Sequence, residues 1–123
     1  MAFTILLILA GLMGAAGVVL AAAGAHAAPH AGLASAAYLL LFHATAVLAS
    51  GALTHQGLLW RPLALAAAIG WIVGAVLFAG HVSARAFIGH RPFPLAAPAG
   101  GTILIAAWLA LAAAAVAGAL NRS

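Results

Sequence analysis

The strongest constraint on this chain is a set of four long apolar stretches separated by short segments rich in proline and glycine. They cover residues of roughly 3–25, 33–54, 62–86 and 95–120. The hydrocarbon core of a bilayer, about 30 Å thick, is crossed by about 20 helical residues, so each stretch is long enough. Strands of a membrane barrel would alternate apolar and polar residues over about 10 positions, and these stretches do not. The pattern predicts an all-α integral membrane protein, a four-transmembrane-helix bundle.

The breaks between the stretches set the expected limits of the helices, because proline and glycine interrupt helical patterns. The break sequences are "HAAPHAG", "HQGLLWRP" and "IGHRPFPLAAPAGG". The last of these contains three prolines, so the fourth helix is expected to begin near Pro98 to Gly101. We predict one domain, residues 1–123, with spans at about 3–26, 34–54, 62–86 and 98–120.

Charge is scarce, and this excludes several classes of protein. Of 123 residues, 68% are hydrophobic and only four are charged, whereas a soluble domain has about 25% charged residues. All four are arginines expected at the membrane surface, not a basic patch for nucleic acid. The chain has no Asp, Glu or Cys. Without them it lacks carboxylate general acids or bases, Ser-His-Asp triads and thiol nucleophiles, so an enzyme is disfavoured.

The same scheme predicts a multi-pass protein of a bacterial-type inner membrane. With four spans, the terminal amine, Arg61 and Arg122 share one side, and Arg85 and Arg91 lie on the other. The amine tips the positive-inside balance toward cytoplasmic termini. Although "AHA" near the end of the first stretch resembles a signal-peptidase site, the apolar run is long and no basic residue precedes it. A retained first helix is therefore favoured over a cleaved signal peptide.

Small residues recur along the stretches. Gly70 and Gly74 form a GxxxG pattern, and Gly14 and Gly17 belong to a small-residue face of the first stretch. Helices in lipid gain from close van der Waals approach, which small residues permit. We expect these four glycines to pack against other helices, within the bundle rather than in a dedicated dimer contact.

Six histidines are the only side chains that titrate near neutral pH. On the four-helix scheme, His55 lies toward one side of the membrane and His43 lies within the bilayer. The other four are expected toward the opposite side: His26, His30, His81 and His90.

Two of these histidines are expected at similar depths. His43 shares a helix face with Ser50 and Thr54, and His81 continues the face of the GxxxG pair toward Arg85. Polar side chains inside a membrane bundle turn toward one another, because lipid offers no hydrogen bonds. The candidate polar-core or ligand-binding residues are His26, His43, His81 and Arg85.

Three interpretations of these histidines compete. In the favoured one they are neutral and hydrogen-bond across helices to hydroxyls or backbone carbonyls. In the second, histidines on the common side bind a metal, or two of them ligate a haem b iron with Arg85 beside a propionate; no HExxH spacing supports this. In the third, they relay protons or bind a polar ligand.

Four segments in order resemble a known membrane family, domain of unknown function 423. They are "AAAGAHAA" (21–28), "LLFHATAVL" (40–48), "GWIVGAVLFAGHVSA" (70–84) and "APAGGTILIAAWLALA" (97–112). The family's motifs map to Ala22–His26, His43–Ala44, Phe78–His81 and Ala97–Gly101. The chain departs from the family pattern at Ala79, at His81, where the family tends to have Ser, and at Ala97, where Thr is usual. His26 and His43 match the pattern and are the better candidates for a shared role.

The resemblance implies a small four-helix membrane protein and no established activity. We therefore expect a protein that acts by helix packing with itself or with a membrane partner in the lipid bilayer, rather than an enzyme. No cofactor is favoured, and a histidine-based haem, metal or small-ligand site is the alternative.

Overall fold

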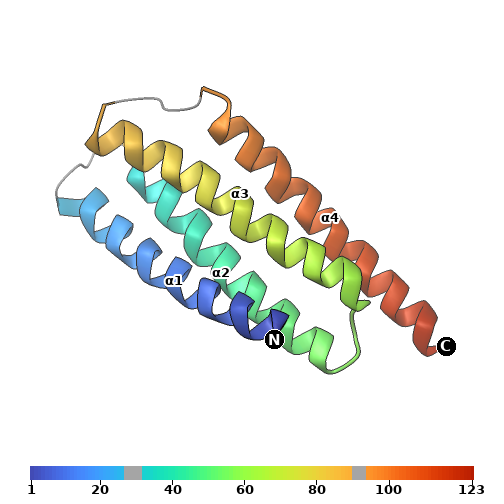
Figure 1. Cartoon of the computed structure of the whole chain (residues 1–123). Helices are drawn as coiled ribbons and strands as arrows, with labels where there is room; N and C mark the ends of the chain where they lie inside the picture. The colour runs from blue at the N-terminus through green and yellow to red at the C-terminus, as the bar shows by residue number, and fades with distance from the viewer. Residues whose placement is uncertain (27–31, 90–93) are drawn as a thin grey trace.

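The protein consists of four long helices, seen in a computed structural model that describes residues 1–26, 32–89 and 94–123 (Figure 1). They are α1 (Ala2–His26), α2 (Leu33–His55), α3 (Arg61–Phe87) and α4 (Ala96–Arg122). Each helix is long and apolar enough to cross a membrane. The predicted all-α architecture of four long apolar helices is confirmed.

Proline positions explain where the last two helices begin. α3 starts at Arg61 with Pro62 in its first turn, where the missing N–H removes no helical hydrogen bond. α4 starts at Ala96, earlier than the expected Pro98 to Gly101, and the N–H of Ala99 already donates to the carbonyl of Leu95 at 2.9 Å. The prediction for α4 was late because a proline in a first turn does not delay a helix.

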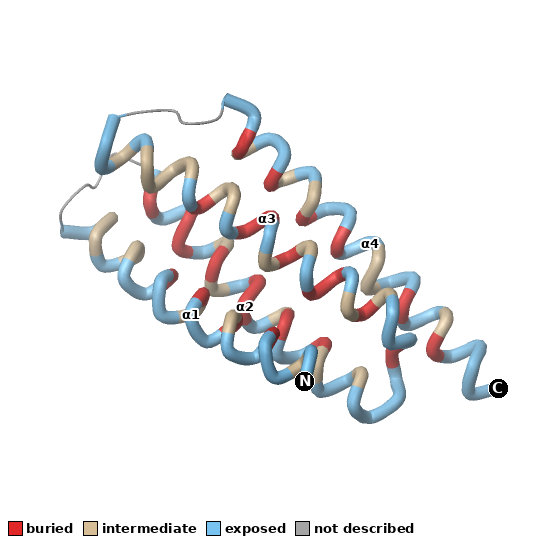
Figure 2. The backbone as a smooth tube through the Cα atoms, viewed as in Figure 1, coloured by how far each residue is buried: buried red, intermediate tan, exposed pale blue. Residues whose placement is uncertain are grey.

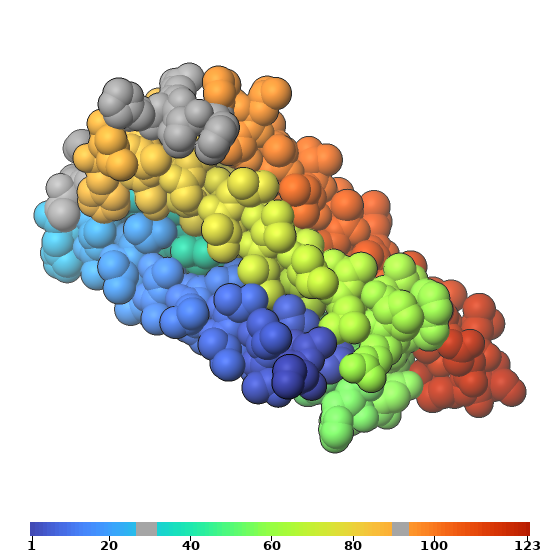
Figure 3. Space-filling view, viewed as in Figure 1, coloured from blue at the N-terminus to red at the C-terminus, as the bar shows by residue number. Residues whose placement is uncertain are grey.

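The helices are arranged so that α2 and α3 form the middle of the bundle. α1 packs mainly against α2, and α4 packs mainly against α3 (Figure 1). Both chain ends lie at the same end of the bundle, as an up-and-down order of four helices requires. α4 therefore forms one edge of the molecule (Figure 3), and most of its residues are not buried.

Small residues allow the middle helices to approach closely. Buried positions run along the facing sides of the helices (Figure 2), and alanines are frequent among them. Trp71 of α3 is the largest fully buried side chain. A bundle with so many alanines gains its stability from close backbone packing rather than from large side chains.

The predicted packing glycines have different surroundings. A Cβ built on Gly74 would lie 2.8 Å from the carbonyl oxygen of Gly100, and one on Gly70 would lie 2.9 Å from the Cβ of Ala107, both in α4. At Gly17 the added atom would lie 2.7 Å from Leu41 of α2. Among the described residues, no atom of another helix lies within 4 Å of a Cβ built on Gly14. Gly14 is therefore not a close-packing position within one copy of the chain, although it shares a helix face with Gly17 in the sequence.

The end of α4 is attached to the connection between α2 and α3. Arg122 donates hydrogen bonds to the carbonyls of Gly57 and Leu58 at 2.8 and 2.9 Å. The backbone N–H of Trp60 donates to the carbonyl of Ala114 at 2.9 Å. These bonds satisfy carbonyl and amide groups that the turn leaves outside the helices.

Large apolar side chains point outward on every helix. Examples, one from each helix in order, are Ile8, Phe42, Val76 and Leu109, all more than half exposed. Contiguous apolar surface of this extent favours association in water, whereas in a bilayer it meets hydrocarbon chains. The outward faces thus fit the membrane-spanning length of the helices.

Candidate functional site

The polar centre of the bundle is His43, about halfway along α2 and only 5% exposed. Its Nδ1 lies 2.7 Å from the carbonyl oxygen of Leu39, one turn earlier in the same helix. Its Nε2 lies 3.1 Å from the indole nitrogen of Trp108 in α4. Both polar atoms of the ring therefore have partners, which offsets the cost of placing an imidazole among apolar helices.

The identity of these partners determines the form of the imidazole. A carbonyl oxygen only accepts hydrogen bonds, and an indole N–H only donates. His43 must then carry its proton on Nδ1 and accept at Nε2, so the ring is neutral. The expectation that His43 turns inward and finds a partner is confirmed, with a backbone carbonyl as one partner. The second partner, Trp108, was not anticipated.

Two tryptophans complete the cluster. The rings of Trp71 and Trp108 are 4.7 Å apart at an angle of 56°, and the rings of His43 and Trp108 are 5.9 Å apart at 59°. The three side chains come from α2, α3 and α4, so the cluster joins three helices. Trp71 is fully buried, while Trp108 is 46% exposed at the edge of the cluster.

A signal for this cluster exists in the sequence. Tryptophans of membrane proteins gather at the two membrane–water interfaces, and Trp60, next to the start of α3, follows that rule. Trp71 and Trp108 instead lie near the middle of apolar helices. A mid-span tryptophan needs a partner for its N–H, and His43 supplies one for Trp108.

The indole of Trp71 is different, because its buried N–H has no hydrogen-bond partner in the described part of the chain. It borders a small cavity of about 100 Å³, also lined by Ser50 and Trp108. The Ser50 hydroxyl donates to the carbonyl of Val47 at 3.0 Å. A buried donor without any partner costs about 1–3 kcal/mol.

The other candidate residues do not join His43. His26 is exposed at the end of α1, Arg85 is exposed near the end of α3, and His81 is half-buried. Within the described ranges, the buried Nδ1 of His81 has no partner. His43 and His81 were expected to lie close together, but no hydrogen bond joins them. Both ring nitrogens of His43 are instead bonded to Leu39 and Trp108. The remaining predicted histidines, His30 and His90, and Arg91 lie outside the described residues.

The donor set does not favour a haem or metal site at His43. A metal ligand must offer a free nitrogen lone pair, and Nε2 of His43 uses its lone pair to accept the Trp108 N–H. Over residues 1–26, 32–89 and 94–123, no group of three or more His, Cys, Asp or Glu side chains is placed to hold a metal ion.

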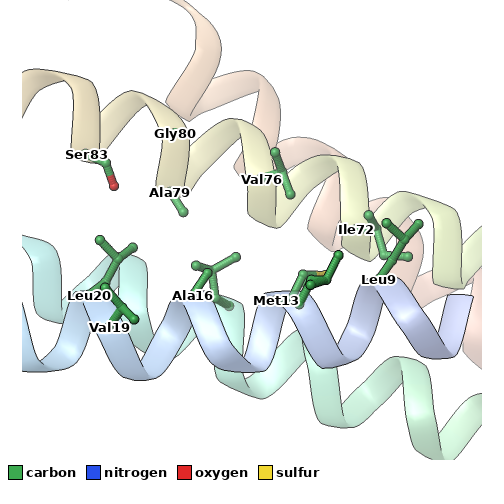
Figure 4. Close-up of a pocket in the computed structure, with 12 residues that line it drawn as sticks. Leu9, Met13, Ala16, Val19, Leu20, Ile72, Val76, Ala79, Gly80 and Ser83 are labelled. Atoms are coloured by element: carbon green, nitrogen blue, oxygen red, sulfur yellow. The ribbon is translucent and has the colours of Figure 1, made fainter.

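A separate groove runs between α1 and α3, with Leu40 of α2 also lining it. Its volume is about 510 Å³, and apolar side chains line most of it. Figure 4 shows Met13 and Ala16 of α1 across the groove from Val76 and Ala79 of α3. Such a surface offers dispersion contacts and few groups for chemistry, as expected of a surface that hydrocarbon chains cover.

Comparison with protein-family models, with curated proteins and with solved structures finds no match for this chain. Conclusions about the function of this protein therefore rest on its sequence and the geometry of its structure. It defines a membrane-type helical bundle whose buried histidine links helices.

Proposed function

We propose that this chain is a non-enzymatic, multi-pass protein of a bacterial-type inner membrane that acts by packing against a second copy of itself through α4. The proposal includes membership of domain of unknown function 423 and cytoplasmic termini. The His43 cluster supports a packing role, because Nε2 of His43 accepts a hydrogen bond from Trp108 of α4, and Nδ1 is bonded to the carbonyl of Leu39 within α2.

A seam of exposed residues on α4 is the observation that carries the proposal. Six exposed positions follow one another in steps of four and three residues: Thr102, Ala106, Leu109, Ala113, Val116 and Leu120. This is the spacing at which helices pack side by side over several turns. α4 contacts mainly α3, so the seam faces away from the rest of the bundle.

A second copy is the occupant that this seam fits best. Small and large side chains alternate along it, at Ala106, Leu109 and Ala113, so two identical helices can interdigitate. A two-fold dimer needs one surface that is complementary to itself. The seam carries no charge, and in lipid such contacts depend on shape. Half-exposed Trp108 lies next to the seam and would add contact area.

The chain is suited to a cross-linking test because it contains no cysteine. Ala106→Cys places a single thiol on the α4 seam, and Ala15→Cys places one on the exposed face of α1, which also carries small residues. In membranes treated with an oxidant, Ala106→Cys is expected to form a disulfide-linked dimer, and Ala15→Cys much less. Dimers that form through Ala15 and not through Ala106 would contradict the role of α4.

Orientation has its own test within the proposal. The structure places Arg61 and Arg122 at the end that carries both termini, and Arg85 near the other end. Cysteines placed at Gln56 and Ile88, both exposed, would report the two sides to a membrane-impermeant thiol reagent. Labelling of Ile88→Cys alone from the outside is expected. Labelling of Gln56→Cys instead would reverse the orientation.

A further inference from the structure

A second cavity lies at the end of the bundle that carries the chain termini. Its volume is about 580 Å³, within the range of about 300–1,000 Å³ typical of ligand sites. Apolar side chains from α1 and α2 form its walls: Phe3, Leu7, Leu48 and Ala52. Polar groups also line it, namely Thr54 and His55 at the end of α2 and Arg61 at the start of α3. The cavity is therefore amphipathic.

The guanidinium of Arg61 is held at this cavity by an aromatic ring. Its central carbon lies 5.6 Å from the centre of the Phe3 ring, a distance at which a cation is attracted to an aromatic face. Arg122, the other arginine at this end, is used differently, because it donates to the carbonyls of Gly57 and Leu58. Arg61 is thus the cation that the cavity presents to a ligand.

This cation has no carboxylate side chain to neutralise it. The chain contains four arginines and no Asp or Glu, so no side chain of its own can pair with Arg61 as a carboxylate. At a membrane surface, the abundant anions are the phosphates of anionic lipids, which attract basic residues next to a membrane span. A phosphate at Arg61 would leave the attached acyl chains beside the apolar walls of the cavity.

We infer that this cavity binds an anionic glycerophospholipid, with its phosphate at Arg61 and His55 and the first carbons of an acyl chain against Phe3 and Leu48. The inference goes beyond the proposed function and does not depend on self-association through α4. A lipid should bind this cavity more tightly than a free anion does, because the apolar walls add binding free energy only for a ligand that carries hydrocarbon.

The test uses the purified full-length chain in a neutral detergent, with phosphatidylglycerol, phosphatidylcholine and inorganic phosphate as probes. Native mass spectrometry measures how much of each lipid stays bound, and thermal unfolding measures the shift that each probe causes. Phosphatidylglycerol is expected to remain bound and to raise Tm more than phosphatidylcholine does. Retention of both lipids to the same extent would overturn the inference, as would an equal effect of inorganic phosphate.

Two arginine variants supply the matched comparison. Arg61→Gln removes the cation at the cavity, and Arg85→Gln removes one near the other end of the bundle; both residues are exposed. Arg61→Gln is expected to weaken phosphatidylglycerol binding roughly fivefold, the effect of about one basic residue at an anionic surface. Arg85→Gln should leave binding unchanged. An equal loss in both variants would mean a general charge effect and would overturn the site.

A third variant tests the cavity without changing charge. Ala52 lines the cavity and is exposed, so Ala52→Phe would fill part of the space without disturbing the core. It is expected to lower phosphatidylglycerol retention while the unfolding temperature without added lipid stays the same. Undiminished retention in a normally folded Ala52→Phe protein would overturn the assignment of the acyl chain to this cavity.

Discussion

The indole N–H of Trp108 donates to Nε2 of His43 across 3.1 Å, and this bond joins two helices that each pack on α3. It links the middle of α4 to the polar centre of α2. Because α4 otherwise depends mainly on α3, the bond helps to determine how α4 is rotated about its own axis. That rotation determines which way the exposed seam of α4 faces.

Trp108→Phe should destabilise the protein, because it keeps most of the ring but removes the donor to His43. The expected loss in unfolding free energy is about 0.6 kcal/mol, the average for hydrogen bonds between membrane helices, and at most about 1.7 kcal/mol. Thermal unfolding in detergent would measure it. Trp60→Phe is the matched control, since Trp60 is exposed to a similar degree, 42% against 46%. Equal losses in both variants would contradict a specific bond.

A double-mutant cycle would measure the coupling between the two residues directly. His43→Leu and Trp108→Phe each remove one side of the bond. The double variant is expected to be less destabilised than the sum of the two, by about 0.5 kcal/mol or more, as for residues in contact. Additive losses would show that the two side chains stabilise the protein independently.

The purified protein is expected to show no Soret band and no stoichiometric transition metal. The reason is that His43 offers no free nitrogen lone pair in this arrangement. A visible spectrum and elemental analysis of one sample would check this. If haem is found, loss of the Soret band in His43→Leu but not in His26→Leu would identify His43 as a ligand of the haem iron and contradict this prediction.

Glycine substitutions should have opposite effects at two positions that look alike in the sequence. Gly74→Ala is expected to cost about 1–3 kcal/mol, because its Cβ would lie 2.8 Å from the carbonyl of Gly100 and must push α4 away. Gly14→Ala should be neutral or stabilising by up to about 1 kcal/mol, because no atom of another helix in the described residues lies within 4 Å of its Cβ, and alanine favours the helix.

Unfolding temperatures of the Gly74→Ala and Gly14→Ala variants in the same detergent would test these opposite effects on stability. A destabilised Gly14→Ala protein would indicate that α1 uses Gly14 in a contact with another chain. It would therefore also weigh against α4 as the sole face for self-association.

Four helices that are long and apolar enough to cross a membrane follow from the sequence, because length and apolarity are local properties of each segment. The inward orientation of His43 also follows from it, since an imidazole facing hydrocarbon would lose its hydrogen bonds. The start of α4 was placed too late, because local reasoning treated Pro98 as a break when it lies within the first turn.

Only the tertiary structure decided which side chains meet. Trp108 is 65 positions away from His43, and their contact depends on how α2 and α4 are rotated on α3. Gly14 and Gly74 have similar sequence surroundings, yet one faces open space and the other faces Gly100. Helical periodicity places residues on a face of their own helix. It does not say which helix lies opposite, because that depends on the packing of all four helices together.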